Sequence, residues 1–574
     1  MRISGNQVSA ADIARLAEVK APAVSNWRQR HAQEFPRSER RDGRDLFLAS
    51  EIAGWLDDRK IAKTDLKDGE APGTTYGARF RKNLGNPATL SEVTQEALWQ
   101  ELERHRGTVD AGVHADLVLG LLYLCAYGRG RWASLVAAAE GRRQRSGIGP
   151  LLKLEMESHE SSVPHLRRLF PATLAEWGDH EQLAAIIRVL DRHRRGAELT
   201  YGQLAISWAA RAFEYLLARF AAAEGKRGAE FFTPPSVVRV LAESIALMPG
   251  DNVHDPCCAC GGILVGAARL MAARTGSAPD LSLSGQALFE RSWRLARMNL
   301  ELNGLAADLG PLPSLALQED LHAGRQFDVI MMNPPFNMSR WSTGDPSADP
   351  RWRYGPPPEH NANFAWLQHA VLSLADGGRA AVVMANGAAS SENVQEQAIR
   401  AAMADDGVVE CLIALPPQLF GATAVPVTIW LLRASAGKIA APAGEIGRPA
   451  GEGSDEILFI DATTLGRMVD RNRRVLDTAD IHRIAGTCEQ WRARRRTGEY
   501  EDVPGFCESV TVREIREHDY RLNPRAHVRP PVDVAAAAET VRSLRRTLGQ
   551  LRARSAEVDA MADRQLDRIS TWKP

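Results

Sequence analysis

The sequence predicts an α/β fold: a doubly wound, mostly parallel sheet with helices on both faces, preceded by a winged helix-turn-helix and a helical domain. The sheet is indicated by apolar runs that alternate with helical patterns from 226 to 435. Residues 95–225 are instead mainly helical in pattern, with Leu98, Trp99 and an apolar run at 117–124. Because the first sixty residues carry a third pattern, the 574-residue chain is expected to contain several domains.

Residues 1–60 are expected to form a helix-turn-helix module. Ser9 can cap a first helix that ends at Leu16, a second helix is expected from Pro22, and an arginine-rich turn at 40–44 is typical of a hairpin that could act as a wing. The second helix would present polar and basic side chains suited to phosphates and base edges: Ser25, Asn26, Arg28, Gln29 and Arg30. The alternative is a small helical domain with a solvated basic face, and we favour DNA binding.

The rest of the chain divides by composition and pattern. Residues 61–94, rich in lysine, glycine and proline, are expected to be a linker. The helical domain is expected at 95–225, the sheet-containing domain at 226–435, a C-terminal extension at 436–530 and a final helix at 531–574. In that helix an apolar stripe follows a heptad-like spacing: Val541, Leu544, Leu548, Leu551, Val558 and Ala562. It predicts a coiled coil or, alternatively, an amphipathic helix folded back on its own domain.

A four-residue motif after the apolar run 327–332 carries the chemistry. It consists of Asn333, Pro334, Pro335 and Phe336. An exocyclic amine is a poor nucleophile because its lone pair is delocalised into the ring. The side-chain carbonyl of Asn333 and the backbone carbonyl of Pro334 could accept both amino protons, while Phe336 offers a face for an extruded base. The motif therefore predicts methyl transfer to a planar amine; an ordinary Pro-Pro turn ending a buried strand is the alternative.

Two segments upstream indicate a cofactor site. Residues 255–262 have the pattern of a strand, a glycine turn and a helix, which is where a nucleotide-like cofactor lies in a doubly wound sheet. No Gly-Lys-Ser/Thr follows, so this is not a phosphate-binding loop of that type. Thr233 and Pro234, before the apolar stretch 237–245, are typical of a helix N-terminus.

These segments, in this order, resemble the modification subunit of type I restriction systems and its relatives among the N6-adenine DNA methyltransferases. The resemblance covers roughly 95 to 435 and continues after the motif through 354–357, 361–366, 377–384 and 415–420. It implies a Rossmann-like methyltransferase sheet, S-adenosylmethionine as cofactor and methylation of adenine N6 in double-stranded DNA. A specificity subunit, which the final helix would dock, and a restriction subunit are the implied partners, in a restriction or phage-defence system.

The resemblance also assigns roles to individual residues. The cofactor would be held by Glu230, Phe231, Phe232, Thr233, Pro234, Pro235, Asp255, Cys258, Ala259, Gly261, Gly262, Gln286, Glu290 and Asp320. Asp320 would contact the cofactor's adenine, and the motif at 333–336 would perform the chemistry. A metal is not implied, because a sulfonium is already an activated methyl donor and alignment supplies much of the rate.

Two positions depart from the family pattern. Ala259 stands where glycine is usual, at a cost of about 1 kcal/mol or more if the backbone needs positive φ. Ala287 stands where glutamate usually holds the ribose hydroxyls, so Gln286 or Glu290 is expected to substitute and cofactor binding to be weakened but retained. The departures motivate an alternative function, a DNA-binding regulator without turnover. Methylation of another planar amide, such as a protein glutamine, is a third reading that the helix-turn-helix disfavours.

Composition indicates how the protein contacts DNA, where it is located and the state of its cysteines. Lys plus Arg and Asp plus Glu both total 71, so DNA contacts must come from local patches or a partner. The polar N-terminus and the absence of a long apolar segment predict a cytoplasmic, nucleoid-associated protein with no membrane contact. Seven cysteines without a secretory signal indicate reduced thiols. Cys257 and Cys260 form a Cys-x-x-Cys that could bind zinc or act in redox chemistry, but no second ligand pair is recognisable and no metal is expected.

Overall fold

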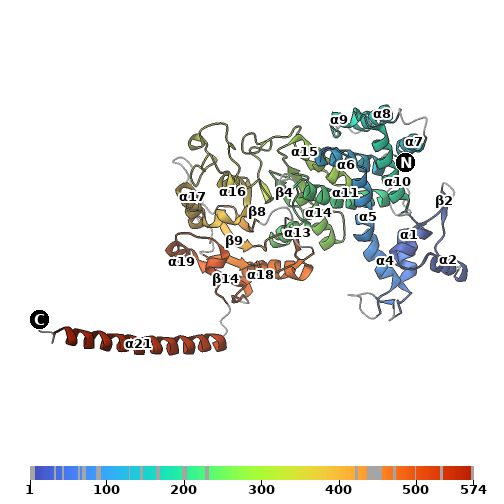
Figure 1. The fold of residues 1–574 in the computed structure, drawn as a ribbon. Helices are drawn as coiled ribbons and strands as arrows, with labels where there is room; N and C mark the ends of the chain where they lie inside the picture. The colour runs from blue at the N-terminus through green and yellow to red at the C-terminus, as the bar shows by residue number, and fades with distance from the viewer. Residues whose placement is uncertain are drawn as a thin grey trace.

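A central sheet organises the molecule (Figure 1). The computed structural model describes residues 7–31, 34–41, 44–62, 65–66, 73–85, 92–127, 129–141, 147–162, 168–196, 203–225, 232–420, 425–435, 456–469, 473–497, 500–530 and 534–570. Within these ranges nine strands form the sheet, in the order β14 (Cys507–Thr511), β11 (Glu456–Asp461), β9 (Val409–Ala414), β10 (Val427–Arg433), β8 (Leu374–Ala385), β7 (Phe327–Met332), β4 (Asn252–Asp255), β5 (Ser282–Gly285) and β6 (Ala307–Asp308).

The predicted doubly wound sheet is confirmed. The five neighbours from β8 to β6 are all parallel, β10 is antiparallel to both β8 and β9, and β14 is antiparallel to β11. Two of these strands, β11 and β14, follow residue 435, where the sequence analysis ended the sheet-containing domain. That boundary was placed too early, because a strand of five or six residues after an Ala- and Gly-rich stretch carries no sign of which sheet it joins.

Helices cover both faces of the sheet. One face packs against α13 (Pro235–Ser244), α14 (Gly262–Thr275), α15 (Glu290–Leu302) and α18 (Thr478–Thr497). The other face packs against α16 (Asn363–Leu372), α17 (Val394–Asp405) and α19 (Val512–Glu517). Alternate side chains of β7 enter the two cores: Val329 and Met331 the first, Ile330 and Met332 the second. This two-sided burial explains why the strands are continuous apolar runs in the sequence.

The N-terminal half of the larger body is a helical bundle. It comprises α5 (Glu92–Arg104), α6 (Ala111–Tyr127), α7 (Arg129–Glu140), α8 (Ile148–Ser162), α9 (Ala172–Ala175), α10 (His180–Gly196) and α11 (Gln203–Ala223). Residues 117–126 of α6 are all buried, which places this helix in the centre of the bundle. The core of the bundle also includes Cys260, Leu295, Met298 and Leu302, which belong to the sheet-containing region, so the two parts share one apolar core.

The first part of the chain forms a small body with its own hydrophobic core. It contains β1 (Gln7–Ser9), α1 (Ala10–Leu16), α2 (Ala21–Arg30), β2 (Glu39–Arg41), β3 (Arg44–Leu48), α3 (Ala49–Asp57) and α4 (Tyr76–Gly85). The strands form an antiparallel sheet of order β1-β3-β2. Val24 is buried and Trp27 half-buried against this core, and the hairpin lies where the wing was predicted.

The prediction of a linker at 61–94 is wrong for residues 76–85, which form the packed helix α4. Helix α4 packs on α1 and α3, and Phe80 is completely buried in the core of the N-terminal body. Tyr76 and Phe80 are four residues apart and therefore lie on the same face of α4. Composition alone did not predict this short amphipathic helix, because the surrounding lysines, glycines and prolines are typical of a linker.

The C-terminal helix extends away from the rest of the molecule. After the β12 (Arg467–Met468) and β13 (Arg474–Val475) pair and α20 (Pro524–His527), the chain continues into α21 (Val534–Ser570), which extends away in Figure 1. Every side chain described between 541 and 564 is exposed. The alternative that this helix folds back on its own domain is therefore wrong. No helix in the described part of the chain has both the length and the apolar character needed to cross a membrane.

Candidate functional site

The cofactor turn and the Asn-Pro-Pro-Phe motif meet at one edge of the sheet. β4 and β7 are parallel neighbours, with His254 opposite Ile330, so their carboxyl ends lie side by side. Asp255 ends β4, and Asn333 directly follows β7. Burial raises the pKa of the Cys257 thiol, and an opposing effect comes from the backbone of Asn333. The structure thus brings together two motifs that are about eighty residues apart, at the place where α/β sheets bind ligands.

Asn333 has one satisfied and one unsatisfied polar atom. Its Nδ2 donates to the Thr233 Oγ1 atom at 3.1 Å. Its Oδ1 is buried and has no hydrogen-bond partner among the described residues. Leaving a buried acceptor unpaired costs about 1–3 kcal/mol, so such an atom in a fixed position is typical of a site that awaits a donor.

Thr233 does not cap α13. The residue before that helix is Pro234, which makes no side-chain cap, and Pro235 is the first helical residue. The Thr233 hydroxyl instead accepts the hydrogen bond from Asn333. The sequence located this segment at a helix start but missed that its hydroxyl orients the motif, because nothing local to residue 233 indicates a partner one hundred positions away. Phe232 is half-buried against the bundle core, and Glu230 and Phe231 lie outside the described residues.

The turn after β4 has the left-handed backbone that the sequence analysis considered. Ala259 has φ 45° and Gly261 has φ 74°, and α14 begins at Gly262. A left-handed alanine costs about 1–2 kcal/mol, so this departure from glycine strains the turn. Two backbone hydrogen bonds hold it: Cys258 N to the Gln286 carbonyl at 2.9 Å and Gly261 N to the Cys258 carbonyl at 2.6 Å.

Asp255 is the buried carboxyl of this turn. Its Oδ1 accepts from the Cys257 N–H at 3.1 Å, whereas its Oδ2 is buried without a partner among the described residues. Burial raises the pKa of Asp255 to about 7, against the smaller opposing effect of the hydrogen bonds from Cys257. Among the described residues, Asp255 Oδ2 and Asn333 Oδ1 are thus both buried acceptors without a hydrogen-bond partner.

The polar atoms of the Gln286 side chain bond to the loop that follows β6. Its Nε2 donates to the Ser314 hydroxyl at 2.6 Å and to the Glu319 carbonyl at 2.7 Å, and its Oε1 accepts from the Leu321 N–H at 3.0 Å. The side chain is completely buried and committed to the 314–321 loop. Its structural effect is to fix Asp320 beside the end of β5.

Glu290 and Asp320 differ in their availability. Glu290 is half-exposed at the start of α15, and its Oε1 pairs with Arg168 at 2.9 Å and Arg294 at 3.1 Å. Only one oxygen of this exposed carboxylate makes these pairs, so Glu290 stays a predicted ligand of the ribose. Asp320 is half-buried, and its Oδ1 accepts from the His322 N–H at 2.8 Å. Asp320 stays a predicted contact of the cofactor's adenine.

The turn after Phe336 is locked by a residue that the sequence analysis did not single out. Asn337 has φ 53°, its N–H donates to the Asn363 Oδ1 at 3.0 Å, and the Asn363 Nδ2 donates back to the Asn337 Oδ1 at 2.9 Å. Pro334 is buried and Phe336 is half-buried against the core beneath α13 and α14. Asn363 lies in the 361–366 segment of the family pattern, which was the available signal.

The predicted DNA-binding residues of α2 are mostly solvent-facing. Ser25, Asn26, Gln29 and Arg30 are exposed. Arg28 is also exposed but pairs with Asp45 of β3 at 2.7 Å, so part of its charge is neutralised within the hairpin. Around the Cys-x-x-Cys, Cys260 is buried in the bundle core. Within the ranges that the structure describes, no cluster of three or more His, Cys, Asp or Glu is placed to hold a metal ion.

A family comparison agrees with this geometry: residues 206–533 match the N-6 DNA Methylase family. The chain belongs to the N-6 DNA methylase family. The match begins in α11 and ends after α20, so the methylase region includes β11 and β14. The chain is 37% identical over 357 residues to a type I restriction enzyme HindI methylase subunit from Haemophilus influenzae, covering 62% of this chain and 76% of that protein.

Two further similarities complete the comparison. A type I restriction enzyme MjaIX methylase subunit from Methanocaldococcus jannaschii is 30% identical over 324 residues, which is 55% of each chain. The crystal structure of a type I restriction-modification methyltransferase subunit from Streptococcus thermophilus superposes with a TM-score of 0.58 at 21% identity, over 76% of this chain and 100% of that one. The N-6 DNA methylase described here thus has the fold of that subunit.

Proposed function

We propose that this N-6 DNA methylase transfers the methyl group of S-adenosylmethionine to adenine N6 in double-stranded DNA, with Asn333 as the acceptor for the amino group. The observation that carries the proposal is the buried Asn333 Oδ1, which has no partner in the part of the chain that the structure describes and is oriented by the hydrogen bond from Asn333 to Thr233. An amide carbonyl accepts a hydrogen bond from an amino group but is too weak a base to remove its proton. It therefore supports chemistry on an exocyclic amine rather than hydrolysis by an activated water.

Each residue of the motif would have a separate role toward the amino group and its base. The Asn333 Oδ1 would accept one amino hydrogen and the Pro334 carbonyl the other, which localises the lone pair on nitrogen for attack. Bound S-adenosylmethionine would supply a methyl group already activated on a sulfonium, so that no strong base is needed. Phe336 would stack on the base once it has left the duplex, at a cost of a few kcal/mol that DNA contacts elsewhere must offset. The Asn363–Asn337 pair keeps the turn rigid for this purpose.

The cofactor turn fits a cationic ligand. Asp255 presents a buried, unpartnered Oδ2, and a buried acceptor of this kind is suited to an ammonium or a hydroxyl donor. The α14 N-terminus directly after the left-handed Gly261 provides backbone N–H groups for a carboxylate. We assign Asp255, Ala259, Gly261, Gly262 and the Asp320 loop to S-adenosylmethionine on this basis.

The partners follow from the family and from α21. The resemblance to type I methylase subunits supports action as a modification subunit with a specificity subunit and a restriction subunit. The exposed apolar stripe of α21 would dock the specificity subunit, while α2 of the N-terminal body would add DNA affinity. Association with the nucleoid would follow from that DNA binding.

A regulator without turnover is the second candidate. Ala287 has a buried, apolar side chain, and the polar atoms of the Gln286 side chain are bonded to the 314–321 loop. These observations favour weak cofactor binding, and the same experiment separates the two functions.

The test is methyl transfer by the chain with its specificity subunit, read as N6-methyldeoxyadenosine by mass spectrometry of digested DNA. Asn333→Ala is expected to lower the rate at least a hundredfold while leaving S-adenosylmethionine affinity within about threefold, because Asn333 acts on the amine. Transfer by Asn333→Ala at the wild-type rate would overturn the assignment. DNA binding without cofactor binding by the wild type would instead favour the regulator, and a methylated protein amide would favour the third reading.

A further inference from the structure

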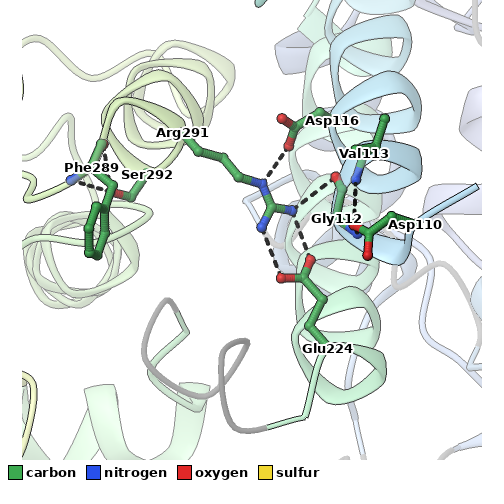
Figure 2. A network of polar contacts seen from close by, with 8 residues as sticks. All are labelled: Asp110, Gly112, Val113, Asp116, Glu224, Phe289, Arg291 and Ser292. Carbon is green, nitrogen blue, oxygen red and sulfur yellow. Dashed lines mark hydrogen bonds and ion pairs between the residues drawn. The ribbon is translucent and has the colours of Figure 1, made fainter.

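Arg291, the second residue of α15, joins the sheet-containing region to the helical bundle (Figure 2). Its Nε donates to Asp116 Oδ1 of α6 at 2.6 Å, and its two Nη atoms donate to both carboxylate oxygens of Glu224 at 2.9 and 2.8 Å. Nη2 also donates to the Gly112 carbonyl at 3.3 Å. Figure 2 shows the guanidinium between α6 and the residue that follows α11.

This cluster differs from an ordinary surface ion pair. The side chains of Arg291, Asp116 and Glu224 are 26%, 18% and 13% exposed, and the pKa of Asp116 is raised by burial. Two carboxylates and a carbonyl fix one planar cation from three directions, so the orientation of the arginine is determined. Removing the arginine leaves two partly buried carboxylates without their common partner, which is costly in a way that loss of an exposed pair is not.

The same helix forms one wall of the cofactor turn. Asn299 Nδ2 donates to the Cys260 carbonyl at 2.9 Å in a buried contact. A Cβ built on Gly261 would lie 3.4 Å from the Cα and Cβ of Ala296, so the turn packs directly on α15. The turn needs such support, because the left-handed Ala259 strains it.

The bundle holds α15 at its other end as well. The Tyr127 hydroxyl of α6 donates to the Glu301 carbonyl at 2.7 Å. Between the two ends, Leu295 and Met298 of α15 and Cys260 of the turn belong to the apolar core of the bundle. Helix α15 therefore contacts the bundle along its length and the cofactor turn at its centre.

We propose that α15 is a strut through which the helical bundle positions the cofactor turn, and that Arg291 is a positioning residue for cofactor binding. The proposal rests on the proposed function, since it concerns S-adenosylmethionine at the 255–262 turn. A shift of α15 would move Cys260 and Gly261 together, and a displacement of about 1 Å is enough to weaken a preorganised site. By linkage, cofactor binding and the contact between α15 and the bundle strengthen each other.

The test compares Arg291→Ala with a matched variant, Arg492→Ala. Arg492 also makes a bidentate pair with a carboxylate, Glu410, at 2.9 Å for both bonds, and donates to the Ser244 carbonyl at 2.6 Å, with 23% of its side chain exposed. It lies in α18, and none of these partners belongs to the cofactor turn. Loss of either arginine is expected to lower thermal stability, but only loss of Arg291 should reach the cofactor.

Three quantities are measured on the full chain with its specificity subunit: the Kd for S-adenosylmethionine by calorimetry, kcat at saturating cofactor, and amide hydrogen exchange of residues 255–262. For Arg291→Ala we expect the Kd to rise at least fivefold, kcat to change less than twofold and exchange of the turn to accelerate. Arg291→Lys, which keeps the charge but cannot bind both carboxylates in the same way, should give an intermediate Kd. Tyr127→Phe should shift the Kd in the same direction by less.

The outcomes separate the strut from the proposed function. If the wild type binds no S-adenosylmethionine, the proposed function fails, and the exchange of 255–262 alone decides the strut. Equal exchange of this turn in the wild type and in Arg291→Ala overturns the strut. An Arg492→Ala variant that weakens the cofactor as much as Arg291→Ala also overturns it, because the effect would then be one of general stability.

Discussion

Asn333 and Thr233 form the smallest functional unit of the site. The hydrogen bond between them is donated by the Asn333 amide nitrogen, so the Asn333 carbonyl stays the proposed acceptor for the amine. Since such a bond contributes about 0.5–1.5 kcal/mol, Thr233→Val should lower kcat by a factor between about 2 and about 13 at saturating cofactor. Thr233→Ser keeps the acceptor and should remain close to the wild type. Steady-state methylation kinetics measure both variants, and an unchanged kcat for Thr233→Val would show that this contact does not orient Asn333.

We expect cofactor binding to depend on pH through Asp255. Burial raises the pKa of Asp255 to about 7, above its unfolded value, so the folded protein without cofactor holds a proton that the unfolded chain has released. The carboxyl therefore lowers the free energy of unfolding as pH rises from about 4 to about 7. A cationic ligand favours the carboxylate, so S-adenosylmethionine affinity should rise as pH increases through about 7.

Calorimetric titrations across this pH range test the sign. Asp255→Asn cannot ionise and should remove most of the rise that is seen in the wild type. An identical pH profile for the two proteins would place the titrating group elsewhere.

At the scale of elements, every side chain of α21 that the structure describes, from 541 to 564, is exposed. Its exposed stripe includes Val541, Leu544, Leu548 and Leu551, which are 50–63% exposed. Deleting 531–574 should therefore abolish co-purification with the specificity subunit while leaving S-adenosylmethionine affinity unchanged, because the helix does not contact the cofactor turn. Retained co-purification after the deletion would mean that another surface docks the partner.

The elements also show what the sequence could predict. The order of strands and helices around Asp255 and Asn333 was predictable, because apolar periodicity and turn residues are local signals. The roles of Thr233 and Gln286 were not, since each depends on a partner brought close only by the folded sheet. The addition of β11 and β14 to the sheet was missed for the same reason. At Ala259, the possibility of positive φ was recognised from the sequence, and the structure supplied the angle.

At the scale of the whole molecule, DNA binding must come from local charge. The chain has equal numbers of acidic and basic residues, so its overall field does not attract DNA. If α2 contacts phosphates, Arg30→Ala should weaken binding uniformly across sequences and reduce the slope of log affinity against log salt by about 1. Arg28→Ala should have a smaller effect, because Arg28 is paired with Asp45. Equal salt slopes for wild type and Arg30→Ala would argue for the solvated basic face.

The most direct test of the account is a map of N6-methyladenine in the genome of a host that carries either the wild-type chain or Asn333→Ala, expressed with the same neighbouring subunits. The account predicts adenines methylated at one recurring sequence with the wild type, and loss of that methylation with the variant, although the variant is present at the same level. Identical methylation in the two strains, or none at all with the wild type, would contradict it.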